Sequence, residues 1–360
     1  MKNRIVVTAA LVAVASFATA SSAQTVAERE EADRAEAQAK ETWTSLMHEN
    51  RAPKAGCFEA SFPNTKWVEV ECGAPSAYRS AVPDTRLQIL GNGSDFVARA
   101  PAGTHFSKVV GSFPTVTGVT SEKSVGVAAF GGGGILGPNE YTLQINTNFA
   151  HTAACKTFTN CIAWVQYVMS TNTPVSLTSS ALTNNTEVFI EYWLIDYGSS
   201  SRAACPAGFI NAGADAQGPG VDCVQNGPAT LIANGQLPIT DLSQITMSGS
   251  ATAGGTDSTT VTFGGRAFTA SVSDSFTDIA SGWTQAEWNV VGNAGGSRAQ
   301  FNAGSHITAK LALTDGSTAT PTCLAPSAIQ GTTGETNNLN AGTCTATGGA
   351  APSIQFTESN

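Results

Sequence analysis

The amino-acid sequence predicts an all-β protein, built as an antiparallel β-sandwich with one N-terminal helix and disulfide-clamped loops. Two observations predict this class. Short strand-like runs, separated by turn residues, recur along the chain. Gly, Thr, Ser and Ala dominate the composition, as in many all-β proteins. The 360 residues are enough for one large β domain with additions, or for two domains.

The first residues have the pattern of a signal peptide. Residues 1–4 form a short basic head, residues 5–20 are largely apolar, and Ser21-Ser22-Ala23 offers small residues for cleavage. We therefore expect residues 1–23 to be a signal peptide, and the mature chain to be secreted to the periplasm or the medium. No later stretch approaches the ~20 apolar residues of a membrane span, so none is expected.

The eight cysteines fit an oxidising compartment. They could pair in about 105 ways, but they fall into couples that are close in sequence. The predicted disulfides are Cys57–Cys72, Cys155–Cys161, Cys205–Cys223 and Cys323–Cys344. No Cys-x-x-Cys pair argues for zinc or redox chemistry, so we expect neither a metal nor a cofactor.

The charge pattern excludes one class of partner. A net charge of −9 with 12% charged residues does not fit a protein that binds nucleic acid through its phosphates. We expect a sparsely charged secreted monomer.

Residues 24–55 have a different composition, rich in Glu, Ala, Arg and Lys. They predict a helix over residues 26–50 with few apolar positions, and therefore a solvated one. The segment could be a propeptide that masks a site, or a plain linker helix. Residues 56–115 predict a small disulfide-closed β region. It begins with a hairpin-like unit that resembles a Gly-Cys-aromatic…Pro…Trp…Cys module of bacterial secreted proteins.

Strand candidates continue through the predicted sandwich domain, residues 116–315. Including those just before this domain, they cover residues 87–90, 96–98, 106–110, 125–130, 141–149, 162–169, 187–197, 244–248, 258–263, 266–272, 286–291 and 306–313. Residues 316–360 form a Gly/Thr/Ala-rich tail with one disulfide, which we expect to be loosely structured.

Four of these strands carry polar side chains at matching alternation, which predicts one polar face on one sheet. The residues concerned are Gln144, Asn146, Gln166, Glu191, Glu287 and Asn289. A Glu among aromatic residues loses hydration, so its pKa rises and it can transfer protons below neutral pH. A Gln amide can donate to a carbonyl oxygen that becomes negative. A Glu and a Gln together can therefore add water to an amide.

The order of these strands resembles the glutamic peptidases (eqolisins) over about residues 141–313. That family has a lectin-like jelly roll with a Gln/Glu dyad in its concave sheet. The resemblance implies that Gln144 and Glu287 are the catalytic pair and that Glu191 and Trp193 line the cleft. We expect the remaining residues of the polar face to contact the substrate: Asn146, Gln166 and Asn289. The chain departs from the family where Asn289-Val290-Val291 follows Ala-Glu-Trp, and where Asn146 replaces a common Gly.

The sequence thus predicts acid-active hydrolysis of polypeptides. One alternative is a non-catalytic carbohydrate-binding sandwich, which would bind a glycan on exposed aromatic rings and leave Glu287 hydrated. Another is a surface-interaction sandwich, with no cleft near Gln144. The same residues also fit a structural role, with Glu287 as a surface carboxylate on an edge strand and Gln144, Asn146 and Asn148 on an ordinary solvated face of an antiparallel sheet. The tryptophans on these strands also fit core positions: Trp164, Trp193, Trp283 and Trp288.

Overall fold

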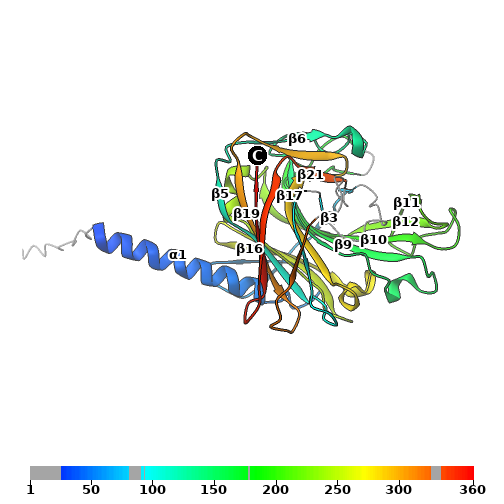
Figure 1. The fold of residues 1–360 in the computed structure, drawn as a ribbon, viewed down its shortest axis with the longest axis horizontal. Coiled ribbons are helices and arrows are strands. Elements are labelled where there is room, and N and C mark those ends of the chain that lie inside the picture. The colour runs from blue at the N-terminus through cyan, green and yellow to red at the C-terminus, as the bar shows by residue number, and fades with distance from the viewer. Residues whose placement is uncertain (1–25, 81–90, 93, 177–178, 326–333) are drawn as a thin grey trace, which may run out of the picture.

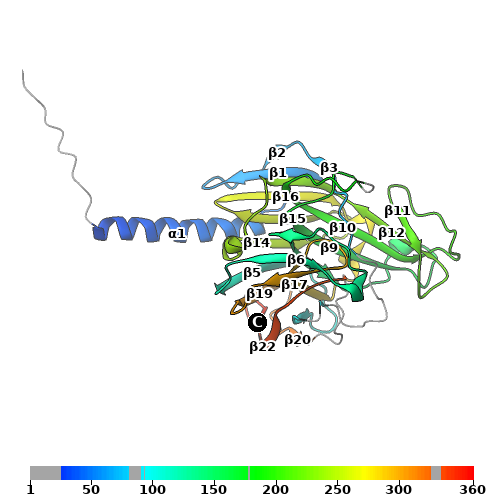
Figure 2. The same ribbon diagram turned by 90° about the horizontal axis from the view of Figure 1, so that it is seen from above.

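The structure, a computed structural model, describes residues 26–80, 91–92, 94–176, 179–325 and 334–360. The predicted signal peptide and the predicted strand at residues 87–90 lie outside the described residues. The fold is an all-β sandwich of antiparallel sheets (Figures 1 and 2). No helix in the described part of the chain has the length and apolarity needed to span a membrane.

A nine-stranded sheet forms one layer. Its order is β2 (Val68–Val70), β1 (Gly56–Ser61), β16 (Arg266–Ser273), β15 (Thr256–Phe263), β14 (Thr246–Ser250), β5 (Lys108–Thr117), β19 (His306–Thr314), β23 (Ser353–Ser359) and β22 (Asn340–Thr347). Strands from residues 56–115 and 316–360 therefore lie in the same sheet as strands from 116–315.

A ten-stranded sheet forms the other layer. Its main path is β11 (Ile210–Ala214), β12 (Val221–Asn226), β10 (Asn185–Tyr197), β9 (Ile162–Ser170), β8 (Tyr141–Thr147), β17 (Gln285–Gly292), β4 (Val97–Arg99) and β20 (Thr322–Leu324). β13 (Pro228–Asn234) joins β10 to β3 (Gly73–Pro75).

A four-stranded sheet has the order β21 (Glu335–Asn337), β18 (Ser297–Phe301), β6 (Glu122–Gly126) and β7 (Gly137–Pro138). Within the described residues, β18 and β21 are the only pair of named strands that runs parallel. Short 3₁₀ turns also occur: η1 (Ala128–Phe130), η2 (Ala153–Cys155), η3 (Ile239–Gln244), η4 (Asp274–Phe276) and η5 (Ile279–Ser281).

The main core lies between the two large sheets. On β8, Leu143 and Ile145 belong to this core, and so does Trp288 on β17. The Trp288 ring packs 4.9 Å from the ring of Phe113 on β5. It also lies over Gly111, where a Cβ atom would come within 2.2 Å of the ring, so only glycine lets the sheets approach this closely. All four predicted core tryptophans are fully buried.

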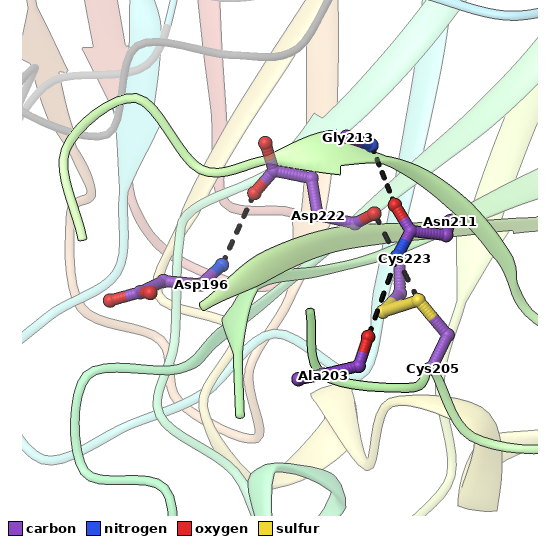
Figure 3. The surroundings of a disulfide bond; sticks show 7 residues. All are labelled: Asp196, Ala203, Cys205, Asn211, Gly213, Asp222 and Cys223. Carbon is purple, nitrogen blue, oxygen red and sulfur yellow. Dashed lines mark hydrogen bonds between the residues drawn. A yellow bond between two sulfur atoms is a disulfide. The ribbon is translucent and has the colours of Figure 1, made fainter. Parts of the chain in front are cut away.

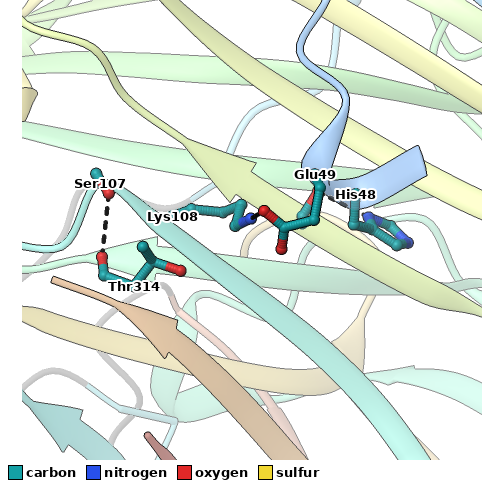
Figure 4. Close-up of polar contacts among 6 residues, drawn as sticks. His48, Glu49, Ser107, Lys108 and Thr314 are labelled. Carbon is teal, nitrogen blue, oxygen red and sulfur yellow. Dashed lines mark hydrogen bonds and ion pairs between the residues drawn. The ribbon is translucent and has the colours of Figure 1, made fainter. Parts of the chain in front are cut away.

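The predicted N-terminal helix is confirmed as α1 (Val26–Glu49). Figures 1 and 2 show that it projects from the sandwich, with only its C-terminal end against the nine-stranded sheet. Trp43, Met47 and His48 are its buried residues. The His48 ring bonds to the Ser248 and Thr262 hydroxyls at 2.8 and 3.1 Å, while Glu49 pairs with Lys108 (Figure 4). Apart from the half-buried Thr44, the rest of α1 is exposed, as its sparse apolar positions predict.

All four predicted disulfides are present. Cys323–Cys344 joins β20 of one large sheet to β22 of the other. Cys205–Cys223 clamps a loop onto β12, next to Asp222, whose carboxylate accepts the Asp196 N–H at 3.2 Å (Figure 3).

The prediction of a loosely structured tail is wrong. Residues 316–360 contain β22 and β23, and β23 pairs along its length with β19. Ile354 and Phe356 explain the difference, since both are buried in the main core and anchor the strand there.

Candidate active site

Four adjacent strands bring the predicted site residues together. β8, β9, β10 and β17 are neighbours in the ten-stranded sheet, and β17 lies between β8 and β4 rather than at an edge. Residue pairing across these strands places Asn146 opposite both Gln166 and Glu287, and Gln144 opposite Asn289. Strand alternation turns these side chains away from Leu143 and Ile145 in the main core. We call this surface the polar face: Gln144, Asn146, Gln166, Glu191, Glu287 and Asn289.

Asn146 connects the two predicted catalytic residues. Its Nδ2 atom donates to Oε2 of Glu287 at 2.9 Å and to Oε1 of Gln144 at 3.1 Å. Gln166 Nε2 also donates to Gln144 Oε1, at 3.1 Å. Because two amides bind its oxygen, the Gln144 side chain is held with its NH₂ group pointing to the other side. That group donates to the hydroxyls of Tyr78, at 2.9 Å, and Thr142, at 3.0 Å.

Glu287 is a buried acid with a second acid beside it. Its side chain is 1% exposed, and the carboxyl group of Asp95, which is also buried, lies beside it. Burial raises the pKa of Glu287 well above its ordinary value, and repulsion from Asp95 raises it further. Burial also raises the pKa of Asp95. Two carboxyl groups in contact favour the state in which they share one proton.

Glu191 occupies the neighbouring part of the polar face with Trp193. Its Oε1 atom accepts from the Trp193 indole at 2.8 Å, from the Ser80 hydroxyl at 2.5 Å and from the Ser80 N–H at 3.3 Å. Burial raises the pKa of Glu191, although the bonds from Ser80 and Trp193 oppose the shift. The predicted cleft residue is therefore covered by another part of the chain.

The covering segment is residues 76–80, which we call the strap. It follows β3 and carries Tyr78 to Gln144 and Ser80 to Glu191. The Tyr78 hydroxyl donates to Glu335 at 2.8 Å while it accepts from Gln144. α1 contacts β14 and β15 of the opposite sheet instead, so it does not cover the polar face.

Some oxygen atoms of this face can still accept hydrogen bonds. Asn146 Oδ1, Gln166 Oε1 and Glu191 Oε2 are buried and have no hydrogen-bond partner within the part of the chain that the structure describes. Buried acceptors are normally satisfied, so donors of a ligand or of water would complete them. Among the described residues, no group of three or more His, Cys, Asp or Glu side chains could hold a metal ion.

Sequence reasoning missed several members of the site. Asp95, Tyr78 and Glu335 come from segments with no clear strand period. Glu358 on β23 was missed because the tail was expected to be loose; its Oε1 atom accepts from Asn289 at 2.7 Å. The one sequence signal for this strand was the period-two spacing of Ile354, Phe356 and Glu358, which places them on one face.

Comparison with known proteins finds no matching family model, no matching curated protein and no matching solved structure. The resemblance to the glutamic peptidases therefore stays a prediction that rests on the residues of the polar face.

Proposed function

We propose that the polar face is the active site of an exported peptidase that works at acid pH. The observation that carries the proposal is the pair of bonds from Asn146, which hold the Glu287 carboxyl group and the Gln144 amide in one network. One nitrogen atom contacts both side chains, so the Glu287 carboxyl group and the Gln144 side chain lie close together on this face. Four disulfides fit the oxidising compartment that export would supply.

The proposed reaction begins with Glu287 and Asp95 sharing one proton. The ionised carboxylate takes a proton from water as the water oxygen bonds to the peptide carbon. The carbonyl oxygen becomes negative and accepts a hydrogen bond from Nε2 of Gln144. The carbon–nitrogen bond then breaks, and a carboxyl group of the pair gives its proton to the leaving amine. One peptide and one water become one carboxylic acid and one amine, and the pair ends with the single proton it had.

The surroundings of the site support peptide hydrolysis over glycan binding. A sugar platform needs exposed aromatic rings and would leave Glu287 hydrated. Instead Glu287 is buried, and so are Trp164 and Trp193. The raised pKa of Glu287 also keeps a proton available for the leaving amine at pH values where an ordinary carboxyl group is ionised.

The test is hydrolysis of a denatured protein by the chain from Gln24 onward, across about pH 2 to 7. Glu287→Gln and Gln144→Ala should each remove the activity, and Asp95→Asn should narrow its pH range. Glu122→Gln is the matched control, because Glu122 is also a buried acid, with its pKa raised to about 9 by burial, and it lies in the four-stranded sheet. Hydrolysis that persists in Glu287→Gln would exclude the proposed chemistry.

A further inference from the structure

The strap lies on the polar face as an extended peptide. Ser76, Tyr78 and Ser80 are buried, while Ala77 and Arg79 between them are partly exposed. This alternation is that of a strand with one face turned to its binding partner. The strap follows β3, which pairs antiparallel with β13.

The backbone of the strap is bound in the way that proteins bind peptide ligands. Asn226 Nδ2 donates to the carbonyl oxygens of Ser76 and Tyr78, at 2.8 and 2.6 Å. The Gly295 N–H donates to the carbonyl of Arg79 at 3.1 Å. These bonds do not depend on strap side chains, so any extended polypeptide could accept them.

Tyr78 fills an apolar pocket at the centre of the strap. Its ring packs 5.5 Å from the ring of Phe189, in a buried cluster with Val168 and Ala229. The pocket accommodates a large aromatic side chain and ends at Gln144. A ligand that uses the same backbone contacts would place such a side chain here.

The contacts also explain why the strap would remain uncut. Gln144 Nε2 meets the phenol oxygen of Tyr78, so the amide is bound to a side-chain hydroxyl rather than to a peptide carbonyl. The hydroxyl and the N–H of Ser80 both donate hydrogen bonds to Oε1 of Glu191. The strap thus binds the Gln144 donor and the Glu191 acceptor of the site, and none of these three bonds involves a carbonyl group of the strap.

One side of the strap remains open. A pocket of about 560 Å³ borders it, lined in part by Tyr78, Arg79 and Asn226. A competing chain could therefore reach the Asn226 amide from this side.

We propose, on the basis of the proposed function, that the strap is an internal inhibitor seated in the substrate groove, and that the substrate is an extended polypeptide with a large aromatic residue in the Tyr78 pocket. The enzyme is then closed in this form, and it opens when the strap leaves.

The test compares the full chain with Tyr78→Ala and with the matched control Ala77→Ser, a neighbouring strap residue that is only partly buried. Tyr78→Ala should raise acid hydrolysis on the order of tenfold or more, since the binding-competent fraction limits the rate. Adding a synthetic peptide with the sequence of residues 73–80 should inhibit the variant again, whereas the same peptide with Tyr78→Ala should not. Among substrates, those with Phe or Tyr should be cut fastest.

Two results distinguish this inference from the proposed function on which it rests. If no variant hydrolyses protein but calorimetry shows the 73–80 peptide binding to the Tyr78→Ala chain, the assignment of the groove stands and the proposal of peptidase activity is overturned. If the unmodified chain hydrolyses protein, the variant is no faster and the peptide neither binds nor inhibits, the strap inference is overturned. Should Tyr78→Ala not fold, the double variant Tyr78→Phe with Ser80→Ala keeps the ring, removes both hydroxyl contacts and should still activate.

Discussion

Glu287 and Asn146 lie directly opposite one another on β17 and β8, with 2.9 Å between Oε2 and Nδ2. The same nitrogen lies 3.1 Å from Oε1 of Gln144. Asn146 transfers no proton and binds no oxyanion in the proposed chemistry, yet it holds in position both side chains that do. It is therefore a positioning residue.

Asn146→Ala should lower kcat by about a hundredfold, because small displacements of reacting groups have effects of that size. KM should change less. The variant should also lose about 1–3 kcal/mol of stability, since oxygens of Glu287 and Gln144 lose a buried donor. Asn293→Ala is the matched control: Asn293 is equally buried, and its amide donates to Glu140 instead. Equal kcat values in the two variants would contradict the positioning role.

Stability should fall as the pH rises above the acid range. Burial raises the pKa of Glu358 to about 8 and that of Asp222 to about 7. A carboxyl group with a raised pKa in the folded state stabilises the fold fully below its unfolded pKa, ~4.3 for Glu. That contribution disappears as pH rises through the folded pKa. Tm should therefore decrease between about pH 4 and 8.

Glu358→Gln isolates one part of this effect. The neutral amide still offers Oε1 to Asn289, so the variant should be more stable than the unmodified chain at about pH 8 and should show a shallower decline. Thermal unfolding across this range measures both. A Tm that rises from acid to neutral pH in the unmodified chain would show that the buried acids are ionised in the fold.

His48 should weaken the attachment of α1 at low pH. Burial, and to a smaller extent the nearby Lys108, lower the pKa of His48 to about 3. The buried, neutral His48 ring stabilises the fold at pH values above the ordinary histidine pKa, ~6.5. This contribution to stability is lost as the pH falls towards the pKa of the folded state. The Glu49 carboxylate, which pairs with Lys108, is the opposing charge beside it. Hydrogen exchange over residues 43–49, corrected for intrinsic rates, should increase between about pH 7 and 4. In His48→Gln this increase should be absent.

The Cys323–Cys344 disulfide should contribute more to global stability than Cys155–Cys161. The first closes a loop with a sequence separation of 21 and joins the two large sheets, whereas the second has a separation of 6. In the chain-entropy description, a disulfide that closes a longer loop stabilises the fold more, and one that closes a loop of ~15 residues contributes about 3 kcal/mol. Urea unfolding of the two Cys→Ser double variants measures the difference. A larger loss for Cys155–Cys161 would contradict it.

Much of the fold could be predicted because its signals are local in sequence. The four disulfides join neighbouring cysteines, and α1 differs sharply in composition from the rest of the chain. Period-two alternation in β8 and β17 predicted that Gln144 and Glu287 would share a face. β23 could have been predicted in the same way, but the surrounding Gly, Thr and Ala residues obscured Ile354 and Phe356.

The strap could not be predicted because its role depends on contacts between distant residues. Tyr78 and Gln144 are 66 positions apart, and Tyr78 and Glu335 are 257 apart. Ser76 to Ser80 form no named strand, and no short motif marks them. Asp95 lies beside Glu287 for a similar reason. The first residues of β17 pair with β4, which begins two residues after Asp95.

The Cys57–Cys72 disulfide ends one residue before β3, so the strap is attached to β1 by a short covalent connection. A short tether keeps a ligand at an effective concentration in the millimolar range. Under the proposed inhibition, dilution of the protein cannot remove the strap, and a free polypeptide must compete with it at every binding event. Substrates held to the enzyme at a second point would therefore be favoured over short peptides of the same sequence.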